Sequence, residues 1–281
     1  MAVTLVISDI HANPWALQAV LDDAARVGFD DIWFLGDLWG YGPEPYSVWN
    51  MLFEHRDKKL VTLAGNHDWA VCGIPAGTMR AEAHAVIKEH QSVLRPEIVE
   101  QVKMWPVMCS PQPGVYLAHG EIASTYQQSV VGYVYYPPLY RPDRLVQDFL
   151  RAFHTDGPTK KVCICYKYSE PTPARLFMVG HTHKQQLWEW DPVSERWRDR
   201  SAPQYTWDNL DTRPIMFNPG SVGFPRDHSG CPAYVTIDWQ SHTLSFHRVT
   251  YNTAQLKKAM QLLPYKALMR DPQFFVEPTC R

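Results

Sequence analysis

Residues 3–13 read VTLVISDIHAN, a short apolar run that ends in Asp9 and His11. Asn13 can cap the first turn of a helix, and Pro14 suits the first helical position, where no amide hydrogen is needed. The stretch therefore predicts a strand that passes directly into a helix, with an aspartate and a histidine at the junction.

Strand-like and helix-like segments alternate in this way through the first third of the chain. We predict that its elements are, in order, 3–7, 14–27, 32–35, 45–53 and 60–63. Further helices are expected over 80–94, 96–104 and 142–153, and strands over 115–118 and 161–168. Strands dominate the last third, over 176–179, 186–190, 214–217, 233–238 and 243–250, with a final helix over 253–263.

No polar linker separates the two β-rich stretches. We therefore predict a single domain over residues 1–281, of the α/β class (α+β by some schemes), in which two sheets pack together with helices outside. A tyrosine- and proline-rich stretch at 125–173 is expected to be an elaboration beside the functional site.

The composition gives the protein almost no net charge. The 27 basic and 29 acidic residues nearly cancel, so we expect no strong nucleic-acid binding and no electrostatic attraction to membranes. The first residues do not resemble a signal peptide, and no apolar run reaches membrane-spanning length. We expect a cytoplasmic protein.

Six cysteines are scattered without the spacing of a zinc knuckle or the density of a disulfide scaffold. We predict that all of them are reduced thiols. Cys163 and Cys165 would share one face of a strand, but they are too isolated in sequence to suggest a metal site, and packing in the core is the expected role.

Five apolar runs end in side chains that bind metal ions. The carboxyl ends of neighbouring strands meet at one edge of a sheet, so these side chains can converge although they are far apart in sequence. Glycines adjoin most of them and permit the close approach of loops around an ion. The expected ligands are Asp9, His11, Asp37, Asn66, His119, His181 and His183.

The predicted ligands are oxygen atoms and imidazoles, without a thiolate, so manganese, iron, zinc, cobalt or nickel is favoured over calcium or a structural zinc cluster. The seven ligands are too many for one tetrahedral ion, whereas two ions that share one carboxylate would use all of them. Two such ions, about 3.5–4 Å apart, activate a water molecule and stabilise both the attacking and the leaving oxygen. Phosphate ester hydrolysis fits this chemistry. Any single histidine is more often structural, so the prediction rests on the combination.

The sequence resembles the calcineurin-like metallophosphoesterases, whose motif blocks all occur here in order. The blocks are Asp9-Ile10-His11, Gly36-Asp37, Gly65-Asn66-His67-Asp68, His119-Gly120 and Gly180-His181-Thr182-His183. The resemblance extends to the helix near Thr253. Residues 36–43 (GDLWGYGP) and 218–223 (NPGSVG) are similar to the bacterial diadenosine-tetraphosphatase-like or phosphoprotein-phosphatase-like branch.

The resemblance implies a metallo-dependent phosphatase fold, a four-layer sandwich of two mixed sheets flanked by helices. It also implies two divalent transition metal ions, with manganese as the first expectation. One ion would be held by Asp9, His11, Asp37 and His183, and the other by Asp37, Asn66, His119 and His181, with a bridging hydroxide as the nucleophile.

The resemblance gives His67 and Asn66 a role in phosphate binding, and His67 would protonate the leaving oxygen. Asp68 could orient the His67 ring as a second catalytic residue. Alternatively, His67 supports the metal ligands structurally and Asp68 caps the following helix.

The chain departs from the phosphoprotein phosphatases because residues 38–42 contain no phosphate-gripping arginine. Arg226 is our candidate for this role, since a guanidinium binds phosphate oxygens in a bidentate way; an ordinary surface pair with Asp227 is the alternative. Glu121 and Ile122 follow His119-Gly120, where serine and proline are common in this branch. The difference leaves the substrate open.

We predict a phosphoesterase that acts on a small phosphorylated substrate, a monoester or a diester, with nucleotides among the candidates. A dinucleoside polyphosphate hydrolase, a phosphoprotein phosphatase or a non-catalytic metal-binding scaffold are the alternatives, and the oligomeric state is open. Five tyrosines could stack a nucleobase, although core packing or an oligomer interface would explain them as well. They are Tyr126, Tyr133, Tyr135, Tyr136 and Tyr140.

Overall fold

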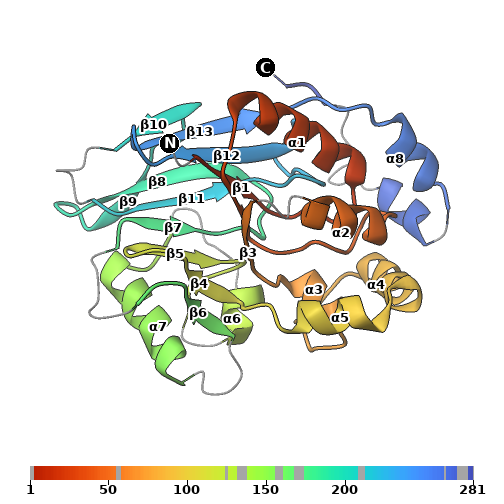
Figure 1. Cartoon of the computed structure of the whole chain (residues 1–281), viewed down its shortest axis with the longest axis horizontal. Coiled ribbons are helices and arrows are strands. Elements are labelled where there is room, and N and C mark those ends of the chain that lie inside the picture. Colours follow the sequence, from red (N-terminus) through yellow and green to blue (C-terminus); the bar gives the residue numbers. More distant parts are fainter. Residues whose placement is uncertain are drawn as a thin grey trace.

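The computed structural model describes residues 3–54, 58–123, 126–131, 138–155, 161–167, 174–207, 213–262, 264–270 and 278–280. Two β-sheets form its centre, and helices lie on both sides of the sheet pair (Figure 1).

The first sheet has six strands in the order β10-β13-β12-β1-β2-β3. Strands β1, β2 and β3 run parallel, and β12 joins β1 in the antiparallel direction, so the sheet is mixed. The strands are β1 (Val3–Ile7), β2 (Asp31–Phe34), β3 (Lys59–Thr62), β10 (Gln204–Thr206), β12 (Ala233–Asp238) and β13 (Thr243–Arg248).

The second sheet has seven strands in the order β6-β4-β5-β7-β11-β8-β9. Strands β5, β7 and β11 run parallel, whereas β5 pairs with β4, and β11 with β8, in the antiparallel direction. The strands are β4 (Met108–Ser110), β5 (Val115–Ala118), β6 (Val162–Ile164), β7 (Leu176–Met178), β8 (Gln185–Asp191), β9 (Arg196–Asp199) and β11 (Ile215–Pro219).

Alternation along the strands builds one apolar core between the sheets and another beneath the helices. Val6 of β1 packs into the same cluster as Leu117 of β5, so these residues face each other across the sheets. Leu5 and Ile7 point the other way and pack with helix residues. Both faces of the central strands are therefore buried, and full burial of each such side chain stabilises the fold by about 1.5–3 kcal/mol.

Helices cover the outer faces. Asn13 caps α1 as predicted, because its side-chain oxygen accepts a hydrogen bond from the Ala16 amide at 3.2 Å. The helices are α1 (Pro14–Val27), α2 (Pro45–Glu54), α3 (Asn66–Val71), α4 (Ala81–Val93), α5 (Pro96–Lys103), α6 (Tyr126–Val131), α7 (Pro142–Thr155) and α8 (Ala254–Ala259), with a short 3₁₀ helix at Tyr265–Arg270. In the described part of the chain no helix has the length and apolar character needed to cross a bilayer.

The predicted fold class is confirmed, and most predicted elements lie within two residues of their observed bounds. Several segments differ. The helix α3 begins at Asn66 itself, β6 is only three residues long, and α8 ends four residues before the predicted bound. The short elements β4, β9, β10 and α6 were not predicted, because so few residues show no period. Part of the tyrosine-rich stretch forms α6 and α7, whereas Tyr133, Tyr135, Tyr136 and the Tyr126 side chain lie outside the described residues.

The prediction that all six cysteines are reduced is wrong for two of them. Cys231 and Cys280 form a disulfide across a sequence separation of 49 residues. The disulfide could not be predicted from the sequence, because only the tertiary structure brings the C-terminal segment beside β12.

Candidate active site

The parallel strands of the two sheets bring the predicted ligands together. Asp9 and His11 follow β1, Asp37 follows β2, and Asn66 follows β3 at the first position of α3. From the second sheet, His119 follows β5, and His181 and His183 follow β7. Backbone hydrogen bonds from Asp9 to Gly36 and from His11 to Asp37 fix the first two loops against each other.

One group of possible ligand atoms consists of Asp9, His11 and His183, which are all buried. The His183 Nε2 lies 3.3 Å from a carboxylate oxygen of Asp9 and 3.1 Å from the Nε2 of His11. The His11 Nε2 is also 3.6 Å from Asp37 Oδ2.

A second group consists of Asp37, His119 and His181. The same Oδ2 atom of Asp37 lies 3.3 Å from the His119 Nε2. Asn66 Oδ1 is 3.3 Å from that nitrogen and 3.0 Å from the Nδ1 of His181. Asp37 thus stands between the two groups, in the position of a shared ligand.

The buried histidines have lone pairs that need a cation. The Nδ1 atoms of His11, His119 and His183 lie 2.8, 2.9 and 2.6 Å from the carbonyl oxygens of Trp39, Leu35 and Phe224. Since a carbonyl can only accept, each Nδ1 is the donor, and a neutral ring then carries a lone pair on Nε2.

Those Nε2 lone pairs point at one another and at carboxylates. His11 and His183 face each other at 3.1 Å, and the buried Oδ1 of Asp9 has no hydrogen-bond partner among the described residues. A metal ion or a proton must lie between such groups to offset the repulsion. The donors therefore fit divalent ions of the imidazole- and carboxylate-binding type.

Charge effects in this cluster are large because it is buried. Burial opposes the charged form of Asp37, but His119 and then His67 hold the pKa of its carboxyl well below the usual range. Burial, and to a smaller extent Asp37, raises the pKa of Asp9. For His119, burial lowers the pKa, but Asp37, Asp9 and the Leu35 carbonyl together outweigh burial and raise the pKa to about 9.

The backbone is strained where it presents the ligands. Asp9, His11, Asp37, His181 and His183 have φ angles between 49° and 64°. This left-handed region costs a residue other than glycine about 1–2 kcal/mol. Such strain persists only where the surrounding structure enforces it, and it is typical of functional sites.

Two glycines allow the loops to come this close. A Cβ atom on Gly65 would lie 2.1 Å from the Asp37 carboxylate, and one on Gly40 would lie 2.2 Å from the Nδ1 of His67. Gly40 also has a φ of 87°, which is unfavourable for any residue that carries a Cβ atom.

The prediction that Asp68 orients the His67 ring is wrong. The Asp68 carboxylate instead accepts four backbone N–H groups, those of Gly65, Asp37, Leu38 and Trp39, at 2.8–3.2 Å. The His67 Nδ1 is buried without a hydrogen-bond partner among the described residues. Asp68, the third residue of α3, therefore fixes the loop that carries Asp37.

A cavity of about 230 Å³ opens onto the ligand cluster. Arg226 lies at this cavity and donates a hydrogen bond to the Tyr41 hydroxyl at 3.2 Å. The Asp227 carboxylate pairs with Arg248. The cavity is lined by Asp37, Tyr41, Asn66, His67, Thr78, Met79, Arg80, His181, His183 and Arg226.

Tyr41 and Arg80 were not predicted as site residues. The Tyr41 ring packs between the rings of His11 and His67, at centroid distances of 4.5 and 4.4 Å. The glycines on either side of Tyr41 were a signal of a tight turn at this position. Arg80 gave no signal, because nothing in its sequence surroundings distinguishes it from a surface arginine.

The segment 218–223 supports the ligand loops from behind. The Asn218 amide donates to the Gly180 carbonyl at 2.7 Å and to the Thr182 hydroxyl at 3.0 Å, which fixes the loop with His181 and His183. The Ser221 hydroxyl donates to the Asp9 carbonyl at 2.8 Å.

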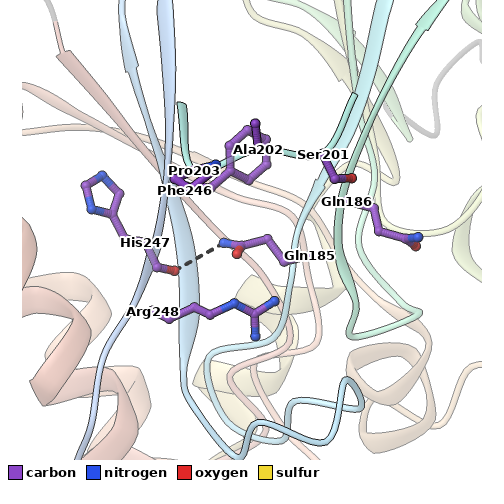
Figure 2. Close-up of a pocket in the computed structure, with 8 residues that line it drawn as sticks. All are labelled: Gln185, Gln186, Ser201, Ala202, Pro203, Phe246, His247 and Arg248. Carbon is purple, nitrogen blue, oxygen red and sulfur yellow. Dashed lines mark hydrogen bonds between the residues drawn. The ribbon is translucent and has the colours of Figure 1, made fainter. Parts of the chain in front are cut away.

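A larger cavity, about 470 Å³, lies elsewhere, between the two sheets (Figure 2). Its central side chain, Gln185, donates to the carbonyl oxygens of Pro219, Tyr234 and His247 and so ties β8 to β12 and β13. No group of possible metal ligands among the described residues lies in it. It is lined by Gln185, Gln186, Ser201, Ala202, Pro203, Phe246, His247 and Arg248.

The family model of the calcineurin-like phosphoesterases matches residues 2–185, more than half of the chain and the part that carries every candidate ligand. The chain belongs to the calcineurin-like phosphoesterase family. The predicted family and enzyme class, a phosphoric ester hydrolase, are thereby confirmed, and membership implies divalent metal ions.

Solved structures resemble this phosphoesterase over most of their length. A metallophosphoesterase from Sphaerobacter thermophilus is 26% identical with a TM-score of 0.66, and the match covers 92% of this chain and 93% of that one. A hypothetical protein from Pyrococcus horikoshii OT3 is 16% identical with a TM-score of 0.63, over 95% and 96% of the two chains, and shows the fold alone.

A curated relative matches over a shorter stretch. An uncharacterised protein of Methanocaldococcus jannaschii is 44% identical over 68 residues, which are 24% of this phosphoesterase and 27% of the relative. The aligned part thus spans about a quarter of either protein.

Of the five tyrosines that could form a stacking pocket, Tyr140 is the one whose side chain the structure describes. It lies at a separate small cavity of about 20 Å³ with Leu139 and Leu145, and its ring contacts the Arg144 guanidinium. Tyr140 does not line the cavity at the ligand cluster.

Proposed function

We propose that the chain is a metal-dependent phosphoesterase that hydrolyses small phosphate esters in the cavity beside Asp37. The observation that carries the proposal is the position of Asp37 Oδ2, which lies within 3.6 Å of His11 and 3.3 Å of His119 and so between two groups of ligand atoms. Two ions sharing this carboxylate would use all seven candidate ligands.

In this proposal the first ion is held by Asp9, His11, Asp37 and His183, and the second by Asp37, Asn66, His119 and His181. When bound, the two ions would supply an activated water molecule and positive charge for the ester oxygens. Manganese is the ion that we would test first, because imidazole, carboxylate and amide oxygen all suit it.

The chain's own residues bind and orient the ester. The Arg226 guanidinium, positioned by Tyr41, can bind two phosphate oxygens at once, and Arg80 adds a second positive charge at the cavity mouth. Asn66 can donate its amide hydrogens to the same oxygens. These groups would bind the phosphate in place of the arginine that residues 38–42 lack.

His67 is the proposed acid for the leaving oxygen. Burial lowers the pKa of His67 to about 4, so the ring is neutral at pH 7 before an ester enters. A phosphate anion beside the ring raises the pKa and favours a proton on it. The ring can then pass that proton to the departing oxygen.

The first experiment combines elemental analysis with hydrolysis of paired aryl phosphate monoester and diester substrates, with and without manganese. Asp37→Asn should lose both metals and most turnover. His67→Ala should keep the metals and lose turnover by about 10²–10⁴-fold, as expected for one acid catalyst. His154→Ala, on the outer helix α7, is the matched control and should change neither.

Equal metal loss in Asp37→Asn and His67→Ala would overturn the roles assigned here. Bound metal without turnover of either ester, or of a dinucleoside polyphosphate or a phosphopeptide, would favour the scaffold alternative. Dinucleoside polyphosphates and phosphoproteins as substrates, the single-domain organisation and the cytoplasmic location remain predictions.

A further inference from the structure

Three cysteines meet at the edge of the second sheet, on and beside strands that carry none of the candidate ligands. Cys109 lies in β4, Cys163 in the neighbouring edge strand β6, and Cys165 just after β6 (Figure 1). Cys109 and Cys163 are direct partners in the parallel pairing of β4 with β6. Cys163 and Cys165 are therefore less isolated than the sequence suggested, because Cys109 joins them from another strand.

The three sulfur atoms are close enough to share one ion. The Sγ of Cys109 lies 2.8 Å from that of Cys163 and 3.4 Å from that of Cys165, and the other two are 3.9 Å apart. Sulfurs bound to one zinc ion at about 2.3 Å would be about 3.8–4.0 Å apart in tetrahedral or trigonal geometry. The 3.9 Å separation already matches this value, whereas the 3.4 Å separation must open by about 0.5 Å and the 2.8 Å separation by about 1 Å.

The cluster also has a route to solvent and thiols with shifted pKa values. Cys109 is buried, Cys163 is half-buried and Cys165 is exposed, so an ion can enter from the outside and reach the innermost sulfur. Hydrogen bonds within the cluster lower the pKa of Cys165 and raise the pKa of Cys109. An incoming ion must displace the remaining thiol protons, because the thiolate is the form of cysteine that binds metal.

We propose that Cys109, Cys163 and Cys165 form a binding site for a soft metal ion such as Zn²⁺ or Cu⁺. Each thiol that binds releases its proton to solvent and donates a sulfur electron pair, and no electron is transferred. Thiolates select such ions over manganese, so this site and the imidazole and carboxylate cluster would take different metals. The ion would tether the edge strand β6 to β4.

The test is a titration of the metal-free, full-length protein with Cd²⁺, without added reductant, monitored by the ultraviolet charge-transfer absorption of cadmium bound to thiolate. The ligand cluster contains no sulfur and cannot produce this signal. At saturation the signal should correspond to one thiolate-bound Cd²⁺ per chain, in addition to any Cd²⁺ that the ligand cluster binds, and competition with Zn²⁺ and Cu⁺ ranks the two ions.

Cys163→Ser should weaken Cd²⁺ binding by more than about 100-fold, beyond the about 10–100-fold typical of losing an indirect partner. Cys72→Ser, which removes a free thiol elsewhere, is the matched control and should keep the signal. Phosphoesterase activity should be the same in both variants, so failure of this site would be distinct from failure of the proposed function.

Two results would overturn the proposal. The first is a Cd²⁺ signal that Cys163→Ser leaves unchanged. The second is a wild-type protein that gives no Cd²⁺ signal. Counting the free thiols of the denatured protein would then show why the signal is absent. Four free thiols would mean that the cluster only packs the core, and two would mean that two of the three clustered cysteines are joined by a disulfide.

Discussion

At the scale of single residues, the carboxylate of Asp68 shows how one side chain can organise a site without touching substrate. Its two oxygens accept four buried backbone N–H groups from the loops that carry Asp37 and Asn66. Hydrogen bonds to an ionised acceptor are about twice as strong as neutral ones. Burial raises the pKa of Asp68, and these bonds oppose that rise and favour the charged form.

We predict that Asp68→Ala destabilises the protein by about 3 kcal/mol or more, because each buried N–H group left without an acceptor costs about 1–3 kcal/mol. Metal affinity should fall with it, since the Asp37 loop loses its support. Denaturant unfolding and metal titration measure both effects. Asp68→Asn keeps one acceptor oxygen and should lose less. A variant that is stable, retains metal and lacks only turnover would show instead that Asp68 acts on His67.

At the scale of elements, α4 is joined to the loop after β2 through His90. This residue is fully buried, its Nδ1 accepts from the Gly40 amide at 3.3 Å, and its Nε2 donates to the Gly42 carbonyl at 3.0 Å. A proton on Nδ1 would abolish the first bond. His90 therefore holds Tyr41, which lies between the two glycines, only in its neutral form.

The pH dependence follows from this neutral state. Burial lowers the pKa of His90 to about 4, below the 6.5 of an exposed histidine. The unfolded chain therefore binds more protons between these values, and stability present above pH 6.5 is lost as the pH falls toward 4, by up to about 3 kcal/mol.

Unfolding of the metal-free protein at several pH values should show this loss, and His90→Gln should lower its slope against pH between 6.5 and 4. The amide of glutamine can accept and donate without titrating. His154→Gln, on the outer helix, should retain the wild-type slope. Parallel curves for wild type and His90→Gln would assign the acid sensitivity to other groups.

At the scale of the whole molecule, the Cys231–Cys280 disulfide ties the C-terminal segment to the loop before β12. Closing a loop of 49 residues restricts the unfolded chain and is worth about 4 kcal/mol on the chain-entropy model. The double variant Cys231→Ser, Cys280→Ser should therefore be less stable by about 2–4 kcal/mol in denaturant. Cys72→Ser serves as the control. Adding reductant to the wild type should cause the same loss of stability. If neither the double substitution nor the reductant lowers the stability, the disulfide does not stabilise the fold.

The sequence alone determined the elements whose patterns are local. Asn13 and Pro14 marked the start of α1, and the short apolar run at 3–7 marked β1, because capping and apolar runs act over a few residues. The candidate ligands were also predictable, since each follows a strand and parallel strands end at a common edge. A three-residue strand such as β4 carries no such period and was missed.

Contacts between distant segments could only be decided by the tertiary structure. The partners of Asp68 lie up to 31 residues away, Cys109 reaches Cys163 across 54 residues, and Arg226 meets Tyr41 across 185. Composition and spacing gave no sign of these pairs. The physical reason is that local patterns fix which face of an element is buried, whereas the packing of two sheets decides which buried side chains then meet.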